Sequence, residues 1–225
     1  MSQSKLTETV QGLERYTLAA LQALIHQLNR AADAVVYGDR QLAHEVLLTT
    51  SERRRECQRV QEDLTSALGQ HPAPDELRAL AALLQIARGA GRLSDECKKI
   101  AMVVPQVPDG PRGAIFIDLV DPAARVSVSA IWLAKQSFAT RDVDLAHEVL
   151  RVDAELRRRS RDIYRAALVA DPVTRSSMAA FLAANYLERV GDIATDLAEQ
   201  TVIAVTGLFW DVTAVPPPDR SAATL

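Results

Sequence analysis

Apolar residues recur along most of the chain at the three- and four-residue spacing of an amphipathic α-helix. In the first such segment, residues 6–36, the apolar positions include Leu13, Ala20, Leu21, Leu24, Ile25 and Leu28. Gly38 then ends the helix, and Asp39 is a suitable cap for a second helix, which we expect over residues 39–68. The opening part of the chain is therefore predicted to be two consecutive helices.

Proline and glycine mark the next joins, because proline lacks the amide hydrogen that a helix interior requires. After a turn at residues 69–74, Asp75 is predicted to cap a third helix that extends to residue 104. Residues 105–113 contain three prolines and two glycines, a composition that neither a helix nor a strand interior accepts. We predict that this segment is the linker between two domains.

The second half of the chain has the same organisation. Helices are predicted over residues 114–140, 142–170 and 172–208. Asp142 and the pair Asp171-Pro172 are the predicted caps of the last two helices. Within the first of the three, Pro122 marks either a kink or a fresh helix start with Asp121 as its cap.

Two sequence blocks indicate that the halves are copies of one unit. The hexapeptide Leu-Ala-His-Glu-Val-Leu occurs at residues 42–47 and again at residues 145–150, an offset of 103 residues. Arg-Leu-Ser-Asp at residues 92–95 aligns with Arg-Val-Gly-Asp at residues 189–192, an offset of 97 residues. The change of offset falls between the second and third helix of the unit, where an insertion costs least. These matches predict an internal duplication.

Helices of about 30 residues are about 45 Å long, and three of them joined by short turns pack antiparallel as a bundle. The predicted fold class is therefore all-α, with two tandem antiparallel three-helix bundles. We expect residues 1–104 to form the first bundle and residues 114–210 the second, with residues 105–113 as the linker. Residues 211–225 lack the helical pattern and are predicted to be a disordered tail.

Composition narrows the possible classes further. Hydrophobic residues make up 48% of the chain, charged residues 24% and aromatic residues 4%, which favours a soluble helical protein. The net charge of −3 gives no overall field that would attract nucleic acid. There is no uncharged apolar run of spanning length and no signal-peptide core, so we expect a cytoplasmic location. Cys57 and Cys97 belong to no Cys-x-x-Cys pair and are expected to be buried thiols.

Four carboxylates lie on one face of the predicted last helix, within an arc of about 80° at 100° per residue. They are Glu188, Asp192, Asp196 and Glu199. Carboxylates at this spacing repel one another by about 0.3 kcal/mol per pair. A cation bridging their oxygens would relieve the repulsion, and Asp153 and Glu155 on the neighbouring helix are the expected additional ligands. The alternative interpretation of the same spacing is a solvated acidic face.

The corresponding face of the first unit has a different charge. Its residues are Arg88, Gly91, Asp95, Lys99 and Met102. Asp95 is the single carboxylate among them, and Lys99 follows it at the four-residue spacing of an ion pair. We therefore expect no cation in the first unit.

Two runs of three arginines lie at nearly equivalent points of the second helix of each unit. The runs are Arg53, Arg54 and Arg55, and Arg157, Arg158 and Arg159. Such runs could dock an acidic partner or phosphates, or they could form a surface paired with nearby carboxylates. The chain contains no Gly-x-Ser-x-Gly, His-Glu-x-x-His or glycine-rich phosphate loop, so the sequence does not predict an enzyme.

The residues of the acidic face also carry a family resemblance. Residues 186–199, Tyr-Leu-Glu-Arg-Val-Gly-Asp-Ile-Ala-Thr-Asp-Leu-Ala-Glu, resemble the third-helix signature of the PhoU family, Leu-Glu-Arg, an aliphatic residue and Gly-Asp. In the first unit, residues 70–72, 75–78 and 85–87 resemble that family's turn and helix start. The tandem three-helix repeat is itself the family architecture, so the resemblance covers nearly the whole chain.

The resemblance implies a non-enzymatic regulator of phosphate uptake and of the phosphate starvation response. Members of the family link the ATP-binding subunit of a phosphate ABC transporter to a sensor histidine kinase and hold signalling off when phosphate is ample. We expect a homodimer that reaches the membrane only through these partners. The alternatives are a PhoU-like paralogue that regulates another transporter or kinase, and a carboxylate-bridged metal-binding protein.

The resemblance also bears on the cation. Members bind iron, zinc or other cations through Glu-x-x-x-Asp motifs on the third helix of each repeat, and here the motif is Glu188 to Asp192. This implies Fe, Zn, Mg or Mn at the second repeat. Asp196 stands where the family often has Asn, which adds a ligand, whereas Gly91 and Lys99 remove two ligand positions from the first repeat.

Overall fold

The computed structural model describes residues 3–107, 113–170 and 173–208, and over this range the chain is helical with no strand. The long helices are α1 (Gln3–Tyr37), α2 (Arg40–Leu68), α3 (Pro74–Val103), α4 (Asp121–Thr140), α5 (Val143–Leu168) and α6 (Arg175–Thr206). A short 3₁₀ turn, η1 (Val104–Gln106), follows α3, and a π-helical segment, η2 (Ile115–Val120), precedes α4. The predicted tail, residues 211–225, and most of the predicted linker lie outside the described residues.

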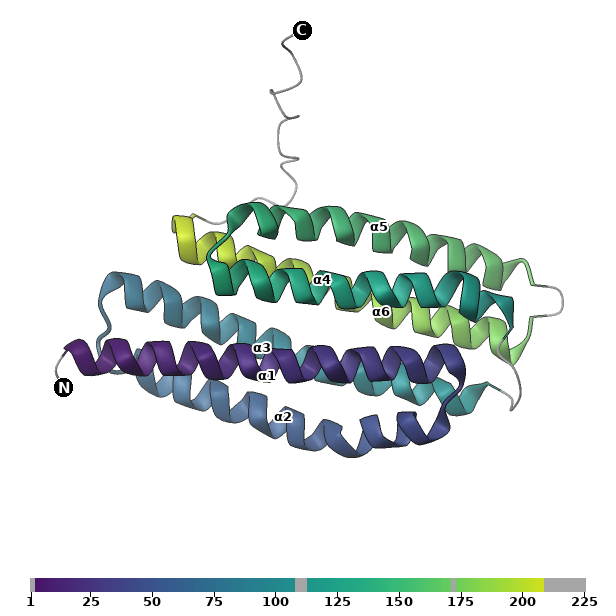
Figure 1. Ribbon diagram of the computed structural model, residues 1–225, viewed down its shortest axis with the longest axis horizontal. Coiled ribbons are helices and arrows are strands. Elements are labelled where there is room, and N and C mark those ends of the chain that lie inside the picture. The colour runs from purple at the N-terminus through teal and green to yellow at the C-terminus, as the bar shows by residue number, and fades with distance from the viewer. Residues whose placement is uncertain (1–2, 108–112, 171–172, 209–225) are drawn as a thin grey trace, which may run out of the picture.

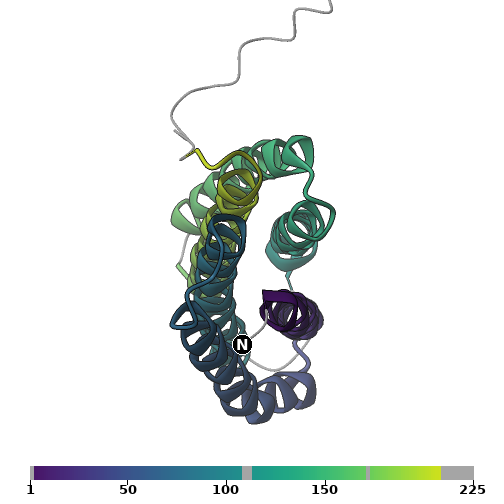
Figure 2. The same cartoon turned by 90° about the vertical axis from the view of Figure 1, so that its left-hand side faces the viewer.

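The helices form two antiparallel three-helix bundles that lie side by side (Figure 1). The bundles meet through α3 against α6 and through α1 against α4. The view along the helices shows α2 and α5 at opposite edges of the molecule (Figure 2). The predicted all-α fold of two tandem bundles is therefore confirmed.

One hydrophobic core runs through both bundles. It is dominated by aliphatic side chains, and alanine is prominent on the helices that meet at the centre. Ala180, Ala183 and Ala184 of α6 have no exposed surface. Gly89 of α3 also permits a close approach, because a Cβ atom there would lie 3.0 Å from Cδ2 of Leu197 on α6. Small residues thus let the central helices pack tightly.

The predicted caps of α2 and α5 are confirmed. Asp39 accepts a hydrogen bond from the Leu42 amide at 2.9 Å, and Asp142 accepts one from the Leu145 amide at 3.0 Å. Each carboxylate satisfies a backbone donor that the helix itself leaves unpaired. The two repeats therefore begin their second helix in the same way.

The starts of α3 and α6 differ from the predictions. Asp75 lies in the first turn of α3 and is not its cap, since the N-cap is Ala73. Proline at the first position already fixes the helical backbone, and Glu76 accepts a hydrogen bond from the Ala73 amide at 3.0 Å. Helix α6 is capped by Thr174 and begins at Arg175, while the predicted cap Asp171-Pro172 lies outside the described residues.

The backbone is helical through Asp121, so a fresh helix start capped by this residue is wrong. The Asp121 amide donates to the carbonyl of Phe116, five residues earlier, as in a π-helix. Pro122 cannot donate an amide hydrogen, and its ring crowds the carbonyl four residues before it. The wider turn of η2 accommodates both effects, and the helix continues into α4.

Two further expectations concern thiols and membranes. Cys57 and Cys97 are free and buried, as predicted, and burial raises the pKa of the Cys57 thiol to about 11. Among the described helices, none combines the length and the apolar character needed to cross a membrane.

Candidate functional site

The acidic face of α6 is divided between two neighbouring helices. Glu188 and Asp192 face α5, where they meet Arg157 and Tyr164. Asp196, one turn further along, faces α3 instead. The four carboxylates that a helical wheel groups together therefore have separate surroundings.

Arg157 of α5 contacts three carboxylates at once. Its Nε donates to Oδ2 of Asp153 at 2.7 Å, and its Nη2 pairs with Oδ1 of Asp192. Its Nη1 lies 3.8 Å from Oε1 of Glu188. The hydrogen bond to Asp153 raises the pKa of the arginine, and burial opposes this only in part. A single guanidinium thus serves as the counterion of this part of the acidic face.

Asp153 is the buried member of this group, with 8% of its surface exposed. Burial raises the pKa of its carboxyl, and the guanidinium of Arg157 opposes that rise. Within the described part of the chain, its Oδ1 atom has no hydrogen-bond partner. A Cβ atom at Gly191 would lie 2.5 Å from this oxygen and 2.9 Å from Cδ2 of Leu156. The glycine of the Leu-Glu-Arg-Val-Gly-Asp segment therefore makes room for Asp153.

Glu188 is held from a second direction by Tyr164. The tyrosine hydroxyl donates to Oε2 of Glu188 at 2.8 Å, and its ring packs against Phe181 with centroids 4.7 Å apart. Burial, followed by the bond to the carboxylate, raises the pKa of Tyr164 to about 12. Glu188 is thus fixed between a phenol and a guanidinium.

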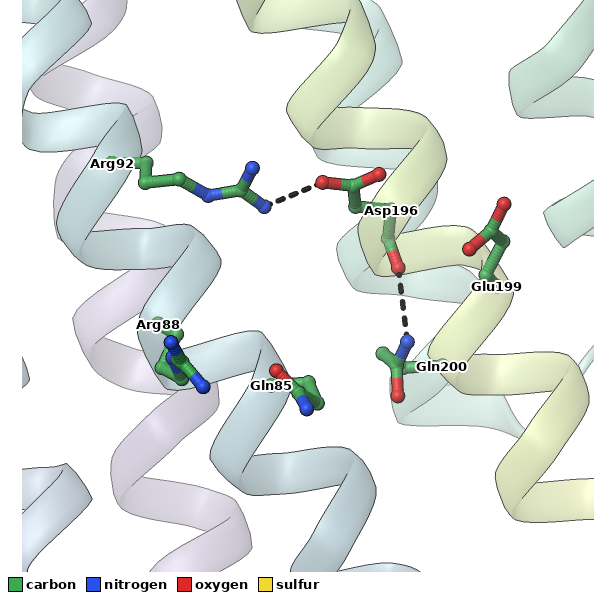
Figure 3. Close-up of a pocket in the computed structure, with 6 residues that line it drawn as sticks. All are labelled: Gln85, Arg88, Arg92, Asp196, Glu199 and Gln200. Carbon is green, nitrogen blue, oxygen red and sulfur yellow. Dashed lines mark hydrogen bonds and ion pairs between the residues drawn. The ribbon is translucent and has the colours of Figure 1, made fainter.

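Asp196 pairs with Arg92 across the boundary between the repeats, at 2.5 Å (Figure 3). This pair lies at a pocket of about 420 Å³ between α3 and α6. The lining residues are Gln85, Arg88, Arg92, Asp196, Glu199 and Gln200. Burial and the neighbouring Asp196 raise the pKa of Glu199. The boundary carries a second such contact, since Arg189 of α6 lies 3.9 Å from Glu96 of α3.

In the first repeat, an arginine occupies the corresponding position. Arg54, which aligns with Arg157 at the offset of 103, pairs with both carboxylate oxygens of Asp95. Thr50 and Gly91 stand where the second repeat has Asp153 and Glu188. The bridging arginine therefore occurs in both repeats. Asp153 and Glu188, two of the three carboxylates that Arg157 contacts, occur only in the second repeat.

The ion pair expected between Lys99 and Asp95 is wrong. Lys99 pairs with Glu96 at 2.6 Å, and Asp95 turns to Arg54 on the neighbouring helix. Both spacings are available on a helix surface, and the competing arginine decides between them.

The structure brings together only part of the predicted ligand set. Asp153, Glu188 and Asp192 converge on Arg157, whereas Asp196 and Glu199 line the pocket beside α3. Glu155 follows Asp153 by two residues, about 200° around the helix. It pairs with Arg159 at 2.6 Å on its own helix.

This arrangement does not fit a metal ion while the arginine stays in place. No group of three His, Cys, Asp or Glu side chains able to hold a metal occurs among the residues that the structure describes. The cation at the second repeat therefore remains a prediction. Sequence reasoning overlooked Arg157 as the counterion, although it follows Asp153 at the four-residue spacing of an ion pair.

The two arginine runs lie on α2 and α5. Arg54, the central residue of the first run, and Arg157, the first residue of the second run, contact the third helix of their own repeat. Arg53 pairs with Glu56 at 2.9 Å. Arg55 and Arg158 are exposed and have no ion pair within the described ranges. Among the described residues, each edge of the molecule thus presents exposed arginine without an ion pair.

The duplicated bundle and its repeated arginine bridge define a tandem three-helix-bundle protein with two related halves. Comparison with known proteins identifies the class more closely. The model of the PhoU domain matches residues 19–104 and 122–201, which cover most of both bundles. The chain therefore belongs to the PhoU family.

Curated relatives agree with this assignment. A phosphate-specific transport system accessory protein PhoU homologue from Pseudomonas putida is 27% identical over 202 residues, or 86% of this chain and 78% of the relative. A homologue of the same name from Burkholderia sp. is 28% identical over 190 residues, or 80% of each chain.

Two solved structures have the same fold. PhoU from Pseudomonas aeruginosa superposes with a TM-score of 0.81 at 23% identity, covering 90% of this chain and 99% of that one. The phosphate transport system regulatory protein PhoU from Streptococcus pneumoniae gives a TM-score of 0.85 at 16% identity, covering 92% and 100%.

Proposed function

We propose that this protein is a non-enzymatic regulator of phosphate uptake and of the phosphate starvation response. In this role it is an adaptor between the ATP-binding subunit of a phosphate ABC transporter and a sensor histidine kinase, and it restrains signalling when phosphate is ample. The observation that carries the proposal is the match of both bundles to the PhoU domain. The names of the curated relatives support the link to phosphate transport.

The shape of the molecule is compatible with two simultaneous partners. Helices α2 and α5 form opposite edges (Figure 2), and each edge presents an exposed arginine, Arg55 or Arg158. Charged groups on separate faces can guide two acidic partners without competition. We propose that each edge contacts one partner and that the adaptor itself functions as a homodimer. Sedimentation analysis tests the homodimer independently.

A phosphate-regulated alkaline phosphatase reporter tests the function. In cells that lack the gene and grow in ample phosphate, the reporter rises, and the wild-type gene returns it to baseline. Arg55→Glu or Arg158→Glu prevents full return, because charge reversal weakens a partner contact. Arg15→Glu, at an exposed position of α1, is the matched control and complements fully.

Copurification separates the proposed adaptor from its alternative. The tagged full-length protein retains the transporter ATP-binding subunit and the kinase, and each charge reversal releases one of them. A silent reporter together with retention of a different transporter or kinase contradicts the proposal and identifies a PhoU-like paralogue.

A further inference from the structure

We propose that Arg157 is the resident counterion of the second repeat, that it excludes divalent metal ions from the three carboxylates around it, and that its removal exposes a metal site. The carboxylates belong to Asp153 on α5 and to Glu188 and Asp192 on α6. The inference does not depend on the proposed function, since it concerns only the chemistry of this group.

The first argument is that arginine and metal compete for the same oxygens. The guanidinium already contacts Oδ2 of Asp153, Oδ1 of Asp192 and, at 3.8 Å, Oε1 of Glu188. A divalent ion that bound these atoms would have to displace it, because a +2 ion beside a fixed +1 charge is strongly repelled. Arginine keeps its proton at every physiological pH and cannot make room by losing charge.

The second argument comes from the duplication. Arg54 forms the same bridge in the first repeat, where Asp95 is the single carboxylate at the position of the group. The bridging arginine is therefore a feature of both repeats, independent of the additional carboxylates. In the second repeat those carboxylates gather around an arginine that the fold already places there.

The third argument concerns what the arginine leaves behind. Without it, three carboxylates from two helices face one another, with Oδ1 of the buried Asp153 lacking a partner among the described residues. Such a set of oxygens suits a hard divalent cation, and Mn²⁺ is a convenient representative. Tyr164 continues to fix Glu188 from the other side, so the ligands are partly preorganised.

Titration of the full-length protein with Mn²⁺ alone tests the proposal, with binding followed by calorimetry and by the loss of the free-ion paramagnetic resonance signal. Arg157→Gln binds about one Mn²⁺ per chain, at least about 30-fold more tightly than the wild type, as expected from removing one positive charge beside the ion. Arg54→Gln is the matched control and gains no binding. Adding Asp153→Asn to Arg157→Gln abolishes the gain.

Circular dichroism establishes that each variant folds, and Arg157→Met, which retains an apolar stem, replaces the glutamine variant if that variant does not. Mn²⁺ raises the melting temperature of the folded Arg157 variant and leaves that of the wild type unchanged. Tight binding of Mn²⁺ by the wild type that Asp153→Asn removes overturns the proposal. Folded Arg157 variants that bind no more Mn²⁺ than the wild type overturn it equally.

Discussion

In the first repeat, Arg54 has a side chain that is 62% exposed and pairs with one carboxylate, that of Asp95. In the second repeat, Arg157 is 44% exposed and pairs with Asp153, whose side chain is only 11% exposed. Because an exposed ion pair is worth little and a buried carboxylate depends on its counterion, the same bridge has unequal consequences. Burial of the partner, more than the arginine itself, decides what the bridge contributes.

The largest expected effect follows from removing the bridge. Arg157→Met lowers the free energy of unfolding by about 2 kcal/mol, because it leaves Asp153 buried without a counterion, and partial exposure of the arginine limits the loss. Arg54→Met produces a smaller loss. Urea denaturation in the presence of EDTA measures both, and equal losses would show that burial does not distinguish the repeats.

The glycine beside Asp153 gives the next largest effect. Gly191→Ala lowers the free energy of unfolding by about 1.5 kcal/mol, because the new Cβ atom collides with Asp153 and Leu156. Gly91→Ala meets no close neighbour in its repeat and raises stability by about 0.5 kcal/mol through helix propensity. Thermal and urea denaturation give the two signs.

A double replacement that copies the first repeat checks the cause of that loss. Ser94 and Thr50 stand in the first repeat where the second has Gly191 and Asp153. Gly191→Ser alone is destabilising, and adding Asp153→Thr recovers most of the loss because the shorter side chain vacates the space. Absence of any recovery would mean that Leu156, and not Asp153, sets the limit.

The hydrogen bond between Tyr164 and Glu188 has a moderate effect. Tyr164→Phe lowers the free energy of unfolding by about 1 kcal/mol, since a bond to a charged acceptor is lost. Ultraviolet titration of the wild type shows one tyrosine that ionises near its raised pKa of about 12, and Glu188→Gln moves this pKa downward. An unchanged titration in the glutamine variant contradicts the assigned role of Glu188.

The smallest effect concerns Glu199, which stands where the first repeat has Met102. Burial and the neighbouring Asp196 raise the folded-state pKa of Glu199, so the protonated carboxyl favours the folded state and the ionised carboxylate disfavours it. The stability present below the unfolded pKa, about 4.3, is therefore lost as the pH rises through the folded pKa. Glu199→Gln therefore raises stability at pH 7 by about 0.3 kcal/mol after solvent screening. The gain disappears below about pH 4, and urea denaturation at both pH values measures it.

Helix positions could be predicted from the sequence because the apolar period and the caps Asp39 and Asp142 act locally. Asp75 satisfies the same local rule, but the helix begins at the preceding proline, two residues before the start that an Asp75 cap would give. The join at Pro122 was harder still, since a π-helical turn depends on how the surrounding chain packs.

The candidate site shows the same limit. A helical wheel correctly grouped Glu188 with Asp192, and the aligned helices correctly brought Asp153 beside them. The helical wheel could not show that Asp196 contacts α3, because a wheel does not show which neighbouring helix packs against each part of a face. The positive charge that neutralises these carboxylates is Arg157, which lies 35 residues before Asp192 in the sequence. A contact between residues so far apart in the sequence is set by how the helices pack.

The ion pairs between the repeats have a consequence for how the molecule arose. Arg92 of α3 reaches Asp196 of α6, and its counterpart Arg189 reaches back to Glu96. The two equivalent arginines thus reach across an antiparallel helix pair in opposite directions, as in an isologous interface between two identical subunits. Their acceptors are not equivalent, because Lys99, and not Glu96, aligns with Asp196. A lone ancestral three-helix unit that paired with a second copy of itself would place the shared arginine in this two-fold arrangement. Fusion of the two copies then allowed the halves to differ in the carboxylates that surround their shared arginine.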